Sequence, residues 1–187
     1  IALISLLCSA MENKQGILLA PTEVLAEQHF LNLSDLVDAS IEFGNDENIR
    51  VCEINKQIKI GLLTGSLNQK TKDKTRSMIV NKEVDIIIGT HALLQEKISK
   101  NLSGLIVIDE QQRFGVDQRN LLLKRNPIPN LLAMSATPIP RTMILAIYGD
   151  MDVSKLMEKP KNRLPILTYS KPEKKIPEII QILKKNI

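Results

Sequence analysis

The stretch Leu105-Ile106-Val107-Ile108-Asp109-Glu110 does most to decide the fold of this chain. Its four consecutive aliphatic residues are typical of a parallel strand that is covered on both faces. A carboxylate that leaves such a strand can hold Mg²⁺ through its water shell, and the neighbouring one can orient or deprotonate a water. The pattern therefore favours a nucleotide-hydrolysing site. Taken alone, an acidic pair that merely opens a solvated turn is the commoner explanation.

Strand and helix patterns alternate along the rest of the chain. Apolar runs occupy residues 17–20, 58–63, 84–88 and 131–134. Helical patterns cover residues 23–38, with Thr22 as the N-cap, residues 69–82 and residues 139–148. This alternation predicts an α/β fold with a mostly parallel sheet sandwiched by helices. Residues 40–57 show no regular pattern and are predicted to form an irregular surface excursion.

Composition narrows the class of protein. A chain of 187 residues with 43% hydrophobic and 25% charged residues is typical of one soluble globular domain, or of one domain and the start of another. Two cysteines without CxxC spacing, and only two histidines, argue against a disulfide framework and a structural zinc site. No apolar run approaches the ~20 residues of a membrane span. The apolar start has no basic residue before Lys14, so it predicts a buried helix rather than a signal peptide.

The last part of the chain is more basic than the rest. Residues 155–187 carry a net charge of +6 against +4 for the whole chain. Pro160 and Pro165 bracket a basic connector, and residues 166–169 and 174–186 resemble one more strand and helix. We expect one domain over 1–157, and over 158–187 a linker with the start of a second domain. The basic tail either lines a DNA path or, as is more common, is a solvated linker and helix face.

Three further segments carry candidate chemistry. Ser135 to Thr142 follow an apolar run, and the hydroxyls of Ser135 and Thr137 could bond to a carboxylate-bound water and to a neighbouring loop, or simply cap a helix. Ala20-Pro21-Thr22-Glu23 turns a strand into a helix whose N-terminus could hold a phosphate, although an ordinary capped helix is commoner. Gly89-Thr90-His91 is predicted to be a similar turn, with His91 more often a packing or capping residue.

One phosphate-binding signature is missing from the sequence. A Walker A loop requires Gly-Lys followed by Ser or Thr, and none of the eight glycines is followed by lysine. The chain thus encodes no phosphate cradle of this type.

Taken in order, these motifs resemble the first RecA-like motor domain of superfamily 2 helicases. They most resemble RecG-type ATP-dependent DNA helicases, which act on branched DNA, with transcription-repair coupling factors as near relatives. The resemblance rests on residues 19–29, 89–95, 109–116, 135–142 and 148–154. It implies a RecA-like P-loop NTPase fold that here lacks the P-loop strand and turn.

The resemblance also implies roles for the matching positions. Asp109 corresponds to the Mg²⁺-binding acid and Glu110 to the water-activating one. The residues that correspond to coupling of hydrolysis to DNA movement are Gln112, Arg113, Ser135 and Thr137. Those that correspond to DNA-backbone contacts are Pro21, Thr22, Gly89, Thr90 and His91. The implied cofactors are ATP and Mg²⁺. The implied partners are branched or forked DNA and the remainder of the helicase chain, at the nucleoid of a bacterial cytoplasm.

The sequence departs from the family pattern in three respects. Gln112 stands where RecG-type helicases usually have His, and residues 40–57 look like an insertion. The chain also starts at Ile1, after the expected phosphate loop, and stops early in the second motor domain. We therefore expect an internal piece of a helicase that is inactive alone. The alternative is a non-catalytic remnant or nucleic-acid-binding module from a split or degraded gene. A small nucleotide kinase is disfavoured, because it too needs the missing loop.

Overall fold

The computed structural model describes most of the first 137 residues and part of the remainder. The described residues are 1–41, 48–54, 56–90, 93, 104–113, 128–137, 151–158, 168, 170 and 172–185, with the backbone alone at Ser40, Ile41, Ile54, Arg113 and Lys185. The chain divides into two units, Ile1–Asp150 and Met151–Ile187.

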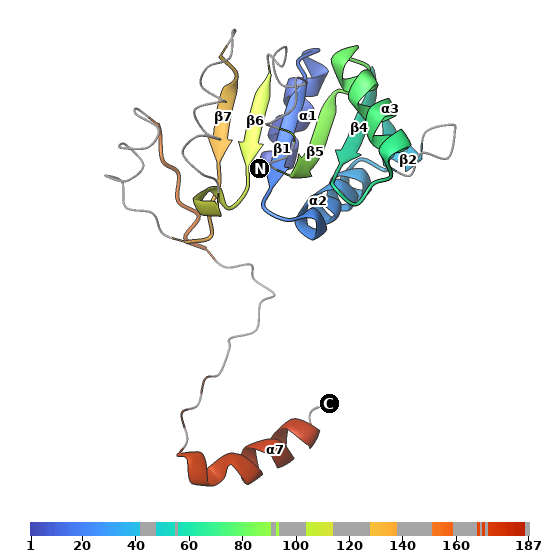
Figure 1. Ribbon diagram of the computed structural model, residues 1–187. Helices are drawn as coiled ribbons and strands as arrows, with labels where there is room; N and C mark the ends of the chain where they lie inside the picture. The colour runs from blue at the N-terminus through green and yellow to red at the C-terminus, as the bar shows by residue number, and fades with distance from the viewer. Residues whose placement is uncertain are drawn as a thin grey trace. The chain divides into compact units, whose positions relative to one another are not determined.

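A seven-stranded sheet forms the centre of the first unit, in the order β2-β3-β4-β5-β1-β6-β7. Five of its strands run parallel to one another (Figure 1): β4 (Lys56–Leu63), β5 (Ile86–Thr90), β1 (Gly16–Ala20), β6 (Leu105–Ile108) and β7 (Asn130–Ala133). The mostly parallel sheet predicted from the apolar runs is confirmed.

The prediction of an irregular excursion over residues 40–57 is wrong where the structure describes this segment. Strand β3 (Ile49–Ile54) pairs antiparallel with β4, and the short β2 (Ser40–Ile41) pairs antiparallel with β3. Ile49 and Cys52 are buried, whereas Arg50 and Glu53 are more accessible. A strand that exposes part of its surface carries charged residues, and these hid the strand pattern in the sequence.

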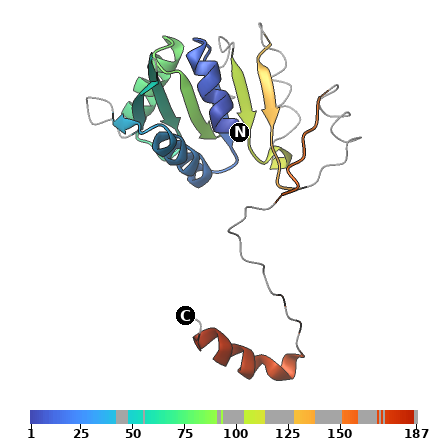
Figure 2. The same ribbon diagram turned by 180° about the vertical axis from the view of Figure 1, so that it is seen from behind.

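Helices cover both faces of the sheet. On one face α1 (Ala2–Met11) and α2 (Glu23–Leu36) bury Leu6, Phe30 and Leu33 against strand residues such as Leu18 and Ile88 (Figure 2). On the other face α3 (Gln69–Val80) buries Ile79 with the alternate strand residues, among them Ile17, Leu19 and Ile87. This alternation explains why the strands read as unbroken apolar runs. The helix expected over 139–148 lies outside the described residues.

The three helices that the structure describes in this unit end in the same way, and none of them uses glycine. The second residue after each helix has a positive φ: Asn13 (61°), Asp38 (49°) and Lys82 (60°). A left-handed residue at this position reverses the chain and commonly ends helices, most often as glycine. The predicted ends at residues 38 and 82 therefore fall two residues beyond the observed ones.

The second unit contains a 3-10 turn, Glu173–Lys175, followed by helix α7 (Ile176–Lys185). These residues match the helix predicted over 174–186. Of the strand predicted over 166–169, the structure describes only Thr168, which is in no strand. The basic connector 160–165 lies outside the described residues. In the described part of the chain, no helix combines the length and apolarity needed to cross a membrane.

The two cysteines should differ in reactivity. Cys8 is exposed on α1, whereas Cys52 is buried in β3. Burial, assisted by the negative charge of Asp85, raises the pKa of the Cys52 thiol, so Cys52 holds less of the reactive thiolate. At pH 8, iodoacetamide should rapidly modify Cys8 alone, and Cys52 should react only after denaturation. Mass spectrometry of tryptic peptides measures both sites, and equal rates in the folded chain would contradict the assignment.

Candidate active site

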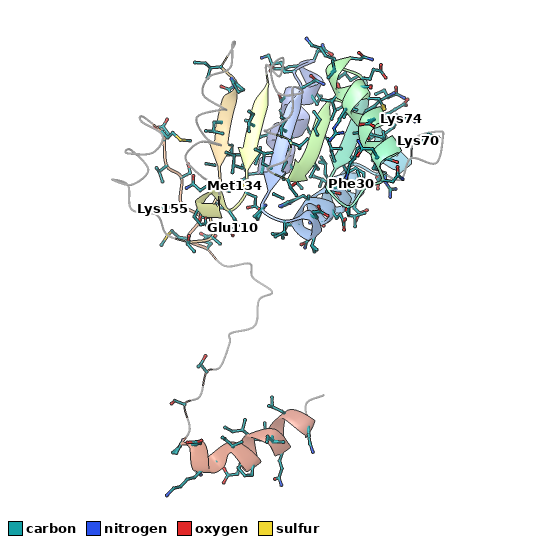
Figure 3. The ribbon with its side chains drawn as sticks, in the orientation of Figure 1. Phe30, Lys70, Lys74, Glu110, Met134 and Lys155 are labelled. Atoms are coloured by element: carbon teal, nitrogen blue, oxygen red, sulfur yellow. The ribbon has the colours of Figure 1, made fainter. Side chains whose placement is uncertain are left out.

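The candidate residues gather at one edge of the sheet, where the parallel strands end. Asp109 and Glu110 follow β6, and Ser135 to Thr137 follow β7, its immediate neighbour (Figure 3, labels Glu110 and Met134). Pro21 and Thr22 follow β1, on the other side of β6. The predicted hydrolytic and coupling residues therefore lie just after β6 and β7. The predicted DNA contacts that the structure describes lie just after β1 and at the end of β5.

Asp109 is held by its backbone and by its side chain. Its N–H donates to the Leu19 carbonyl (2.9 Å), which extends the ladder between β6 and β1 by one bond. Its carboxylate oxygen Oδ2 lies 2.8 Å from His29 Nε2 on α2. The two side chains are 20% and 23% exposed, so the carboxylate remains reachable from solvent.

Glu110 turns the chain away from the strand. Its φ of 49° lies in the left-handed region, which costs an L-residue about 1–2 kcal/mol. The turn brings the Gln111 N–H to the Met134 carbonyl (3.1 Å) and leads into the 3-10 helix Gln111–Arg113. The structure gives no position for the Arg113 side chain.

Gln112 connects the acidic pair to the hydroxyl segment. Its Nε2 donates to Glu110 Oε2, and its Oε1 accepts a hydrogen bond from the Ser135 hydroxyl (2.9 Å). A side-chain amide has one donor end and one acceptor end. Gln112 can therefore donate to Glu110 and accept from Ser135 at the same time, but it cannot take up a proton. Gln112 thus makes a direct link between the segments that follow β6 and β7.

Ser135 and Thr137 form one compact bend. The Thr137 N–H donates to Ser135 Oγ (3.1 Å), and the two hydroxyls lie 2.9 Å apart. Because the Ser135 hydroxyl has a single proton, donation to Gln112 leaves its lone pairs to accept from Thr137. Residues 138–142 of this motif lie outside the described residues.

The structure describes four of the five predicted DNA-contact residues. Thr22 is exposed and caps α2, with its Oγ1 accepting from the Leu25 N–H (3.3 Å), and Pro21 precedes it half-buried. Gly89 and Thr90 were predicted to lie in a turn, and this prediction is wrong. They are the last two residues of β5, and both are buried. Strand pairing with Leu19 and Ala20 holds them in extended backbone. His91 lies outside the described residues.

Two features of this edge escaped the sequence analysis. One is His29, whose contact with Asp109 joins residues far apart in the chain. The other is the bend Thr64-Gly65-Ser66 after β4, where Glu23 Oε2 accepts from the Ser66 N–H (3.2 Å) and Lys72 Nζ donates to the Gly65 carbonyl (2.6 Å). An apolar strand followed by Thr-Gly-Ser was the only sequence signal for this bend.

The oxygen atoms at the end of β6 suit magnesium better than a transition metal. Mg²⁺ in nucleotide sites is typically held by one or two carboxylates and completes its shell with waters and phosphates. Asp109 and Glu110 supply such carboxylates, and hydroxyls lie on the adjacent strand. Among the described residues, no cluster of three or more His, Cys, Asp or Glu side chains could enclose a metal. This donor set fits an ion that is shared with a bound nucleotide.

The mostly parallel sheet with helices on both faces is a RecA-like fold. The sequence profile of the DEAD/DEAH box helicases matches residues 1–145, and the chain belongs to this family.

Several proteins that are similar to this chain are helicases of one type, RecG. The ATP-dependent DNA helicase RecG of Streptococcus pneumoniae is 42% identical over 173 residues, which cover 92% of this chain and 23% of that protein. RecG of Mycobacterium leprae is 42% identical over 172 residues, 89% of this chain and 22% of the relative. A solved structure of RecG bound to a three-way DNA junction matches this chain with a TM-score of 0.73 and 31% identity. The match covers 98% of this chain and 22% of the RecG chain. The chain thus spans less than a quarter of these relatives.

Proposed function

We propose that this chain is part of a RecG-type, ATP-dependent DNA helicase that acts on branched DNA in recombination and repair, and that it contains most of the first motor domain. The observation that carries the proposal is the bridge through Gln112, which joins Glu110 at the end of β6 to Ser135 at the end of β7. A bridge of this kind lets the state of the hydrolytic acid affect the neighbouring segment, as coupling of hydrolysis to movement requires.

The two carboxylates of the acidic pair would have different roles in hydrolysis. Asp109, whose backbone N–H is bonded to the Leu19 carbonyl, would hold Mg²⁺ through water, and the ion would neutralise charge on the phosphates of ATP. Glu110 would orient the attacking water and accept its proton. Gln112 keeps the Glu110 carboxylate in place by donating to it. The 187 residues contain no Walker A loop, so the cradle for ATP must come from another segment or chain.

DNA contacts would lie on the β1 and β5 side of the same edge. The exposed Thr22 and the α2 N-terminus, with its positive dipole end, are suited to a phosphate of the DNA backbone. Gly89 and Thr90 are buried, so any contribution from β5 would come from the end of the strand. We extend the proposal to a first motor domain over residues 1–157, a linker and second-domain segment over 158–187, and action at the nucleoid of a bacterial cytoplasm.

A chimera tests this function directly. Residues 1–187 replace the matching segment of RecG of Streptococcus pneumoniae, and ATP hydrolysis is measured with and without a three-way DNA junction. We expect hydrolysis that depends on Mg²⁺ and rises when the junction is added, whereas the 187-residue chain alone should show none above background. A chimera that folds, as judged by circular dichroism, but does not respond to DNA would contradict the proposal and favour a non-catalytic remnant.

A further inference from the structure

His29 on α2 is a polar side chain at this edge that the proposed function has not used. His29 precedes the buried Phe30 and so lies beside the helix stripe that faces the sheet. It is half-buried rather than solvated, and its Nε2 contacts Asp109 at 2.8 Å. An ionised carboxylate can only accept a hydrogen bond, so Nε2 must carry the proton that is donated.

This contact engages one oxygen of the carboxylate and leaves the other for a metal-bound water. Oδ2 accepts from His29, and no described residue donates to Oδ1. Hydrogen-bonded partners of metal-binding carboxylates fix their orientation, and their loss typically costs about 10- to 100-fold in metal affinity or activity. The hydrogen bond to the Leu19 carbonyl fixes the position of the Asp109 backbone, and the contact with His29 fixes the direction of the Asp109 carboxylate.

We propose that His29 is a positioning residue that holds the Asp109 carboxylate in the orientation that magnesium-dependent hydrolysis requires. The inference rests on the proposed function for its catalytic consequence, but the contact itself can be tested without it. Thr22, the N-cap of the same helix, lies about 10 Å along the helix axis from His29. Helix α2 and its N-cap therefore carry both a proposed DNA contact and the contact with Asp109.

The first experiment examines the contact in the 187-residue chain. The chain has two histidines, His29 and His91, so long-range ¹H–¹⁵N spectra of the imidazoles contain two sets of signals, which His29→Gln assigns. Asp109→Ala should shift the His29 signals and leave those of His91 in place. His29 signals that do not respond to Asp109→Ala would overturn the proposal.

The second experiment measures the consequence in the chimera. His29→Leu removes the donor at similar volume, and kcat should fall about 10- to 100-fold while the Mg²⁺ concentration for half-maximal rate rises about tenfold. The KM for junction DNA should stay unchanged, and His29→Gln, whose Nε2 can still donate, should recover most of the rate. The matched control is Gln28→Leu, an exposed position on the same helix, which should leave the rate unchanged.

Two comparisons separate positioning from a merely structural role. The melting temperature of His29→Leu should stay within about 4 °C of the parent, because a partly exposed pair contributes little stability. If His29→Gln is as impaired as His29→Leu, or if His29→Leu keeps its rate and Mg²⁺ requirement, the proposal is wrong. A parent chimera without DNA-stimulated hydrolysis contradicts the proposed function instead, and the imidazole spectra then decide the contact alone.

Discussion

Replacing Glu110 by Gln should lower the rate of ATP hydrolysis by the chimera about 10²- to 10⁴-fold, the usual contribution of a general base. The substitution keeps the shape of the side chain, and the amide oxygen of the new residue can still accept from Gln112 Nε2. The bridge to Ser135 should therefore persist while the ability to take a proton from water is lost. A steady-state assay at saturating ATP and junction DNA measures the effect.

A matched control shows that the effect belongs to this position. Glu12 is exposed after α1, near the amino ends of the parallel strands, and pairs with Lys14 at 2.7 Å. Glu12→Gln makes the same chemical change away from the candidate site and should leave the rate unaltered. An undiminished rate in Glu110→Gln would remove Glu110 from the mechanism and leave the acidic pair with Asp109 as its one functional member.

Replacing Gly89 by Ala should destabilise the first unit by about 3 kcal/mol, at the upper end of overpacking effects. A Cβ atom at this position would lie 2.3 Å from the Leu63 carbonyl oxygen of β4 and 2.7 Å from Leu93 Cδ1. Backbone in the middle of a paired sheet cannot move aside, so β5 would have to separate from β4. The melting temperature should fall by about 6–12 °C for a domain of this size.

Gly16→Ala is the control for this prediction. There the nearest atom to a new Cβ is Leu6 Cδ2 at 2.6 Å, the far end of a flexible side chain that can rotate away. Its loss of stability should be distinctly smaller. If Gly89→Ala melts like the parent but binds DNA more weakly, Gly89 serves DNA binding rather than strand packing. Equal destabilisation of the two variants would contradict the packing explanation.

The alternation of apolar runs and helical patterns predicted the parallel strands, the order of elements and the Thr22 cap, because each depends on local sequence. The paired β3 was missed since half of its surface is accessible and carries Arg50 and Glu53. The left-handed residues that end the helices were missed because none is glycine. These errors arise where packing, rather than local preference, decides the backbone.

The candidate site was predictable in its parts but not in its connections. Apolar runs that end in polar residues indicated Asp109, Glu110 and Ser135 as candidates. The links through Gln112 and His29 could not be predicted, because they depend on the order of strands and on the direction in which side chains point. Contacts between residues so far apart in sequence leave no periodic signal.

The position of β1 in the sheet has a consequence for how the chain folds during synthesis. Ile17 is made before both of its neighbours across the sheet, Ile87 and Ile106. The antiparallel pair β3–β4 can form locally. One edge of β1 stays open until β5 has left the ribosome, and the other stays open until β6 has followed. A nascent chain of this kind should expose an apolar strand for several seconds of translation, the interval in which an unpaired strand is prone to aggregate.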